Sequence, residues 1–289
     1  MSNSTSTDSG NSGFQKYPYD PSEAAAIIFT VLFALTTSLH AFQLISKRTW
    51  FMIPFFIGGI LEIVGYIGRV IAATEAPGPY ETGPYIVQTI TLLVAPALFA
   101  ASIYMQLGRI VLMLKADDKL FIRRTWVTKI FVAGDVASFL LQAAGGGLSA
   151  SDDSNTSKLG KDIIIVGLFV QIVFFGLFVV VAALFNIRLN KNPTPSAHTL
   201  PWKKHMYTLY AVSILIFVRS IVRVVEFIQG FEGYIYSHEV FLYVFDATMM
   251  FIAMGIMNVV HPGEVAVIVR GQLQGEKDVE SGSELVESR

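Results

Sequence analysis

Long apolar segments constrain this sequence more than any other feature, because they leave few folds open to the chain. Seven can be placed by hydropathy, and each exceeds the ~18 residues that distinguish a membrane span from a helix buried in a soluble core. They cover residues 24–45, 51–72, 85–112, 126–149, 162–187, 206–229 and 239–260. The backbone of each must be satisfied internally within a bilayer, and the period-two alternation of barrel strands is missing. The pattern predicts an all-α membrane protein with seven transmembrane helices.

Basic residues in the connections between these segments predict the orientation of the bundle. Thirteen lysines and arginines fall in the connections at one end, whereas the opposite connections contain only Lys16, Lys158 and Lys161. Because positively charged loops stay in the cytosol, we expect the N-terminus outside the cell and the C-terminus in the cytosol.

The two ends of the chain are polar and are predicted to be disordered tails. Residues 1–20 form the expected extracellular tail and residues 264–289 the cytosolic tail, on either side of a membrane domain over residues 21–263. Asn-x-Ser/Thr sequons begin at Asn3 and Asn155, both on the predicted outer side. Glycosylation is therefore expected at these two asparagines in a secretory pathway that carries out this modification.

Composition excludes several kinds of chemistry. The chain has no cysteine, so disulfides, thiolate metal sites and cysteine catalysis are ruled out. It lacks a P-loop motif, and its five histidines are too scattered to supply three zinc ligands at one depth. We therefore expect no metal, no cofactor and no enzymatic activity. A net charge of −1 without a basic arm also argues against a nucleic-acid partner.

Ionisable residues inside the predicted spans require an explanation, because each costs about 2.5–3.5 kcal/mol at a helix centre on insertion scales. A spacing of seven residues places Glu62 and Arg69 on one helix face. Arg219, Arg223 and Glu226 share a face in the same way. Four carboxylates and three guanidiniums nearly neutralise one another, so a single inward-facing polar cluster is predicted. Its members are Glu62, Arg69, Asp135, Arg219, Arg223, Glu226 and Asp246, with Gln88 at a similar outer depth.

Two interpretations of this predicted cluster stay open. Ionisable residues inside membrane spans usually mark a path for ions or substrates, in which case these side chains bind a cargo. Alternatively, the charges only hold the second and sixth spans in register, as buried ionic networks also do.

The glycines favour a structural interpretation. Gly58, Gly59, Gly65 and Gly68 give the second span a small surface for close helix packing. The consecutive glycines at 145–147 are expected to end the fourth helix.

Ordered motifs recur along most of the chain. They are "YPYDPSEAA" before the first span, "EIVGYIGR" in the second, "LLVAPALFAASIYMQLGRI" in the third, "FVAGDVASFLLQAAGGG" in the fourth, "GLFVQIVFFGLF" in the fifth, "RSIVRVVEFIQGFEG" in the sixth, and "EVFLYVFDATMM" with "NVVHPG" in the seventh. Over about residues 17–263 they together resemble the fungal lipid-translocating exporter family, the RTA-like proteins. The family pattern also covers the charged positions found independently above, together with Tyr66, Gln142, Glu239 and Tyr243.

The resemblance implies seven spans and a transporter that moves amphipathic lipids, sphingoid long-chain bases or phospholipids, across or out of a membrane. Resistance to toxic lipids or drugs is the implied outcome, and the plasma membrane the implied site. Porphyrin or haem movement is associated with relatives and is kept as an alternative. Membrane lipids and a small amphipathic substrate are the expected partners. A seven-helix sensor, whose loop "LKADDKLFIRRT" and acidic tail recruit other proteins, is the competing interpretation.

The mechanistic hypothesis is a polar groove open toward the outer half of the bilayer. Glu62, Glu226 and Asp246 receive a cationic amine through charge-assisted hydrogen bonds. Arg69 and Arg223 hold these carboxylates or contact a phosphate, while the lipid tails stay in hydrocarbon.

Overall fold

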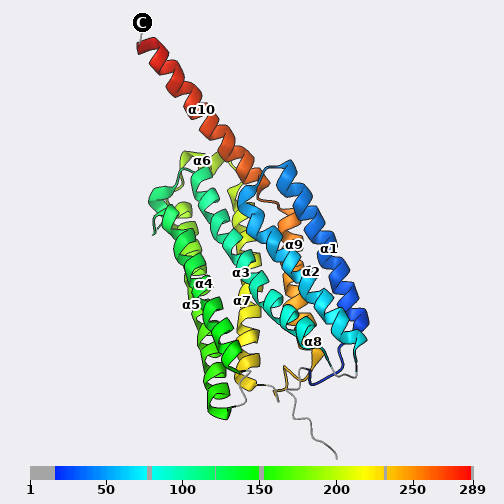
Figure 1. The fold of residues 1–289 in the computed structure, drawn as a ribbon. Helices are drawn as coiled ribbons and strands as arrows, with labels where there is room; N and C mark the ends of the chain where they lie inside the picture. Colours follow the sequence, from blue (N-terminus) through cyan, green and yellow to red (C-terminus); the bar gives the residue numbers. More distant parts are fainter. Residues whose placement is uncertain (1–16, 77–79, 121, 150–152, 231–232, 288–289) are drawn as a thin grey trace, which may run out of the picture.

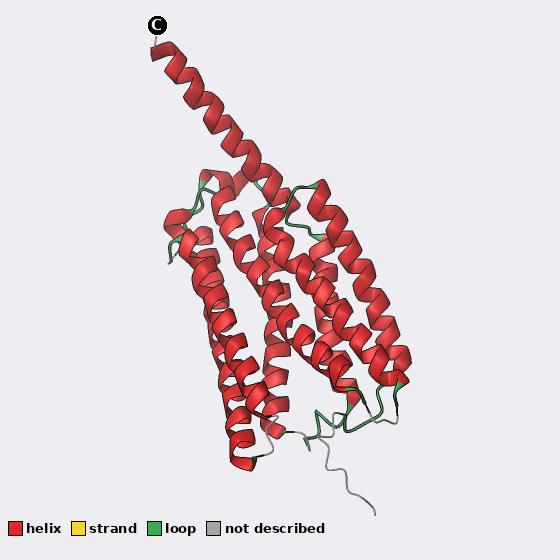
Figure 2. Cartoon of the chain, viewed as in Figure 1, coloured by secondary structure: helices red, strands yellow, loops and turns green. Residues whose placement is uncertain are grey.

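Helices make up all the regular structure that is described for this chain. The computed structural model gives side chains as far as Gly275 and describes residues 17–76, 80–120, 122–149, 153–230 and 233–287. In these stretches every regular element is a helix and the connections are loops (Figure 2). The prediction of an all-α protein is thereby confirmed.

The order of the elements follows the predicted apolar segments closely. They are α1 (Glu23–Ser46), η1 (Trp50–Met52), α2 (Ile53–Thr74), α3 (Thr82–Met113), η2 (Asp117–Lys119), α4 (Arg124–Ser149), α5 (Ser154–Lys191), α6 (Pro195–Thr199), α7 (Trp202–Gln229), α8 (Glu239–Leu242), η3 (Tyr243–Thr248), α9 (Met249–Val259) and α10 (Gly263–Glu287). Side-chain caps begin two of them: Ser22 Oγ accepts from the backbone N–H of Ala25 in α1, and Asp153 Oδ2 accepts from that of Thr156 in α5.

Within the described residues, six helices are long and apolar enough to cross a membrane. They are α1, Trp50–Thr74, α3, α4, α5 and the continuous stretch Glu239–Val259. Large apolar side chains on their outer faces are exposed, for example Leu35 at 64%, Leu140 at 61% and Ile187 at 62%. Such exposure suits contact with lipid rather than water. The chain is therefore a multi-pass membrane protein.

The helices form one bundle in which α3 and α7 lie in the middle. α4 and α5 pack together on one side of this central pair, and α1, α2 and α9 lie on the other (Figure 1). α6 and α10 mark one end of the bundle, which we call the α10 end (Figure 1). The opposite end, where α8 lies, we call the α8 end.

Residues 263–287 are helical, in the part of the chain predicted to be a disordered tail. α10 runs over Gly263–Glu287 and projects away from the bundle (Figure 1). Val265 and Val269, one helical turn apart, are buried against the bundle. Arg270 Nη2 donates to the carbonyl of Lys47 at 2.7 Å. These contacts hold the first turns of α10 against the bundle. The apolar face of this segment is too short to predict a helix from the sequence pattern.

The glycines at 145–147 do not end α4, which continues to Ser149. Gly145 instead lies against α5, and a Cβ added there would come 2.5 Å from the carbonyl oxygen of Gly160. Three of the four glycines predicted to pack α2 closely face α3 in the same manner: Gly58 meets Phe99, Gly65 meets Leu92, and Gly68 meets the carbonyl of Pro84. The small residues of this bundle thus let helices approach closely.

Candidate functional site

Three arginine–carboxylate pairs form the core of the site, in the half of the bundle nearer the α8 end. They are Arg69–Glu239 at 2.6 Å, Arg223–Glu226 at 3.0 Å, and Arg219–Asp246. The first joins α2 to α8, the last joins α7 to η3, and the Arg223–Glu226 pair lies within α7 at i, i+3. With Glu62 these residues make up what we call the charge cluster.

Arg69 is held on several sides by oxygen atoms and aromatic rings. Besides the pair with Glu239, its Nη2 donates to the hydroxyl of Tyr19 at 3.0 Å and its Nε donates to that of Tyr243 at 3.1 Å. The guanidinium also lies 5.8 Å from the ring centroid of Tyr17. Only 1% of the Arg69 side chain is exposed. The desolvation cost of this charge is offset by one carboxylate, two hydroxyls and cation–π contacts.

The segment before α1 crosses the α8 end and contributes to this site. Tyr17 donates from its hydroxyl to Gln88 Oε1 on α3 at 2.8 Å. The backbone N–H of Ser22 donates to both carboxylate oxygens of Glu239, at 2.9 and 3.1 Å. We call residues 17–22 the strap, because they tie α2, α3 and α8 together. Burial raises the pKa of Tyr17 and Tyr19 and the charge of Arg69 opposes this, so both phenols stay protonated.

Arg219 connects three elements deeper in the bundle. Its Nε donates to Asp246 Oδ1 of η3, and its Nη2 donates to the backbone carbonyl of Leu92 on α3 at 2.5 Å. Asp246 belongs to a π-helical segment, Tyr243–Thr248, in which Tyr243 contacts Arg69. Insertions of π-helix occur frequently at functional sites. Here the segment presents one side chain to each of two arginine pairs.

Glu62 is the carboxylate of the charge cluster that has no partner. It is fully buried, and within the described part of the chain neither of its oxygens has a hydrogen-bond partner. Asp246 and Arg219 are the charged groups near enough to act on it electrostatically. The hydroxyl of Tyr66, one turn further along α2, is likewise buried without a partner among those residues. Three arginines therefore serve three other carboxylates, and Glu62 is left over.

Asp135 lies apart from the charge cluster, which corrects the prediction of a single cluster. Its Oδ2 accepts a hydrogen bond from Tyr104 of α3 at 2.9 Å, and no other charged group acts on it in the described residues. Gln88 does join the site, through Tyr17. The remaining predicted residues, Glu62, Arg69, Arg219, Arg223, Glu226 and Asp246, all lie in the cluster.

The predicted site residues did not include Glu239 or the strap tyrosines, although the family pattern covers Glu239. Glu239 is the first residue of a predicted span, where a charge costs little and draws no attention. Tyr17 and Tyr19 precede the first span and carry no charge. Both lie in the motif "YPYDPSEAA", and Glu239 begins "EVFLYVFDATMM". Those motifs were the signals available for these residues.

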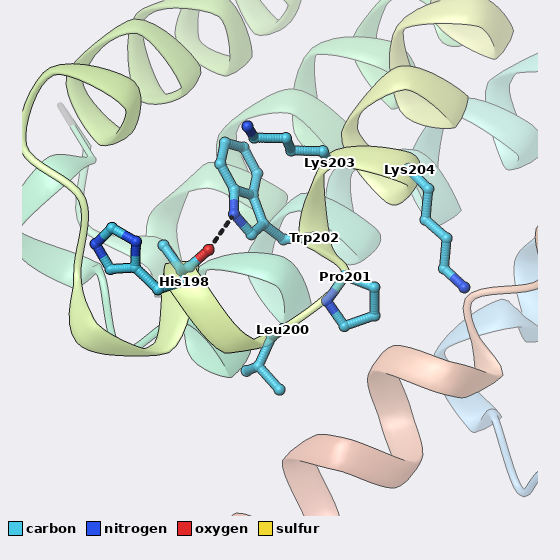
Figure 3. A pocket seen from close by; sticks show the side chains of 7 residues that line it. His198, Leu200, Pro201, Trp202, Lys203 and Lys204 are labelled. Carbon is cyan, nitrogen blue, oxygen red and sulfur yellow. Dashed lines mark hydrogen bonds between the residues drawn. The ribbon is translucent and has the colours of Figure 1, made fainter.

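Other candidate sites add little. No group of three or more His, Asp or Glu residues in the described stretches can hold a metal ion. A shallow hollow of about 300 Å³ at the α10 end is lined by one local turn, where Trp202 Nε1 donates to the carbonyl of Ala197 at 3.0 Å (Figure 3). It lies at the opposite end from the charge cluster. Of the two predicted glycosylation sites, Asn155 is exposed in the first turn of α5, and Asn3 lies outside the described residues.

This bundle, with helices of membrane-spanning length and paired charges in its interior, defines the class: a multi-pass helical membrane protein with an ionic core. Residues 55–267 match the family described as RTA1 like protein, and the chain belongs to that family. The resemblance seen in the motifs is thereby confirmed. No solved structure matches the chain.

Three relatives from Saccharomyces cerevisiae illustrate the similarity. Protoporphyrin uptake protein 1 is 41% identical, over 83% of this chain and 89% of the relative. Protein RTA1 is 40% identical, over 86% of each chain. Sphingoid long-chain base transporter RSB1 is 27% identical, over 82% of this chain and 70% of the relative.

Proposed function

We propose that this protein moves amphipathic lipids with a single positive charge across a membrane, foremost sphingoid long-chain bases. The observation that carries the proposal is Glu62, a fully buried carboxylate left unpaired beside three arginine–carboxylate pairs. A surplus of one negative charge suits a ligand with one amine. The relative named as a sphingoid long-chain base transporter supports the same substrate class.

The proposed topology has seven spans, with α7 as the seventh. α7 contains 28 residues, enough for roughly 42 Å at 1.5 Å per residue. Its charges lie inside the bundle in ion pairs with Asp246 and Glu226, so they do not oppose insertion beside the other helices. The basic connections lie at the α10 end, which we place in the cytosol, with the α8 end outside. We propose the plasma membrane as the site and Asn3 and Asn155 as glycosylated positions.

The proposed path leads the headgroup past the charge cluster while the tails stay in lipid. Glu62 receives the amine, and Arg219 with Asp246 fixes the walls of the site. Arg69, Gln88 and the strap close the α8 end, so this contact must open to release the lipid outward. Arg223 and Glu226 lie near the same exit. We place Asp135 outside the path, as a contact between α4 and α3.

The test is transport by purified protein in proteoliposomes, measured with a fluorescent sphingoid base. The Glu62→Gln variant removes the surplus charge, and we expect the protein-dependent rate to fall at least tenfold. Glutamine keeps the size of the side chain and cannot ionise, so the melting temperature of this variant should be unchanged or higher.

Asp135→Asn is the matched control, because it makes the same chemical change at another buried carboxylate. We expect this variant to transport at close to the native rate. Native-like transport by Glu62→Gln, or an equal loss in both variants, would contradict the proposed site.

Porphyrin transport is the second candidate, and the relative named for protoporphyrin uptake favours it. A porphyrin carries two propionate groups, whereas all three arginines of the charge cluster are already paired. The cluster therefore suits a cation better than a dianion. The same proteoliposomes, loaded with protoporphyrin, decide between the candidates by the ratio of the two transport rates.

A further inference from the structure

Glu62 raises the question of what neutralises it when no lipid is bound. An ionised carboxylate that is fully buried without a partner costs several kcal/mol, and such groups usually take up a proton instead. We propose that Glu62 is a proton-binding site and that the proton and the lipid amine occupy it in turn. Transport is then an exchange of one lipid cation for one proton. This inference rests on the proposed function, because it specifies how the same site is driven.

The groups that face Glu62 support this assignment. η3 contributes Asp246 and α7 contributes Arg219, which are paired with each other and add no net charge. Its own helix contributes the unpartnered hydroxyl of Tyr66. Among the described residues, α1 and α3 present no charged group to it. No neighbouring cation is therefore free to neutralise Glu62, and a mobile one must do so.

Three buried polar side chains, Thr37, His40 and His261, are spaced between the region of Glu62 and the α10 end. Thr37 Oγ1 of α1 lies against Gly59, where an added Cβ would come within 2.5 Å of it, and Gly59 is one turn from Glu62 on α2. His40 follows Thr37 by one turn, and its ring centroid lies 6.4 Å from that of His261. Thr37 Oγ1 and His261 Nε2 are buried and have no hydrogen-bond partner among the described residues.

Groups of this kind can bind water and pass a proton along the series. Burial lowers the pKa of His261 to about 4, with the charge of Lys47 as the next contribution. His261 is therefore neutral at neutral pH. Its Nδ1 accepts from the backbone N–H of Gly263 at 3.0 Å, so the unpartnered Nε2 carries the hydrogen and can donate it to a water. At the α8 end the polar groups are engaged in bonds: Tyr17 donates to Gln88, and Arg69 donates to Tyr19 and Glu239.

The exchange is balanced in charge and in protons. In the resting site Glu62 is a neutral carboxylic acid. When an ammonium group enters, the proton leaves Glu62 and the carboxylate forms an ion pair with the amine. The site is neutral in both states, so the two ligands exclude each other and binding of one must release the other.

The direct test measures proton release from purified protein in detergent and weak buffer. A pH-sensitive dye records the response to a short-chain sphingoid base, and we expect close to one proton released per protein at neutral pH. Glu62→Gln should release none, whereas Asp135→Asn should respond as the native protein does. Binding of the base without proton release would overturn the exchange.

A second measurement requires no lipid and separates the two proposals. Infrared difference spectra should show a carboxylic-acid C=O stretch at neutral pH that disappears in Glu62→Gln and persists in Asp135→Asn. In proteoliposomes, an imposed proton gradient should accelerate movement of the base toward the acidic side, after subtraction of passive uptake in Glu62→Gln vesicles. Transport that ignores the gradient, with no Glu62 band, overturns the exchange but keeps the proposed function. A Glu62 band without any transport overturns the proposed function instead.

Discussion

The charge cluster and the contact between α4 and α5 solve the same problem in different ways. Both place polar groups inside a bundle that the membrane deprives of water. In the α4–α5 contact the groups are neutral and close together: Ser138 Oγ donates to the carbonyl of Gly167 at 2.6 Å, and Gln142 Nε2 donates to Ser138 Oγ at 2.8 Å. In the charge cluster full charges are paired, in two of the three pairs between different elements, and among the described residues Glu62 remains unpaired.

This difference indicates what each region contributes. The α4–α5 contact depends on small residues that let two helices touch, so side-chain volume should decide its stability. The charge cluster depends on compensated charge, so changes of volume matter less there than changes of charge.

The largest effect is expected from Arg219→Met. This change leaves Asp246 as a buried charge without a partner and removes the donor to the carbonyl of Leu92. We expect a loss of about 3–5 kcal/mol in the free energy of unfolding, measured by denaturant titration in detergent. A double variant with Asp246→Leu should recover most of this loss. If the double variant is no more stable than the single one, charge compensation does not govern the cluster.

A smaller effect is expected from Gly145→Ala, which tests the importance of volume in the α4–α5 contact. The new Cβ meets the backbone of Gly160 and Ile164, so the two helices must separate. We expect a cost of about 1–3 kcal/mol, read from the melting temperature. Gly146→Ala is the matched control, because open space surrounds that position and alanine favours a helix over glycine by about 0.5–1 kcal/mol. Equal melting temperatures for the two variants would contradict close packing.

The smallest effect is expected at the α10 end, when pH falls. The pKa of His261 is about 4 in the folded protein, against about 6.5 for an unperturbed histidine, so the unfolded chain binds more protons between these values. Stability is therefore lost as pH falls from about 6.5 toward 4. We expect faster hydrogen exchange at the start of α10 over this range, and a flatter profile in His261→Asn. An identical profile in the variant would exclude His261 as the cause.

The sequence determined the all-helical fold and most members of the site. Apolar runs of this length must form helices in a bilayer, and this requirement is independent of how the helices later pack. Glu62, Arg219 and Asp246 stood out for the same reason, because a charge inside such a run is costly wherever it points. The family resemblance could also be seen in the ordered motifs, such as "EIVGYIGR".

Only the tertiary structure decided which charges are paired. Helical spacing placed Glu62 and Arg69 on one face, yet Arg69 binds Glu239, 170 residues further along the chain. Asp135 was grouped with the others, yet in the described part of the chain its side-chain hydrogen bond is to Tyr104. A charge in a membrane helix shows that some partner is needed, but not which helix supplies it, because that depends on the rotation and depth of each helix in the bundle. Glu62 could therefore be recognised as the unpaired carboxylate only once the helices were in place.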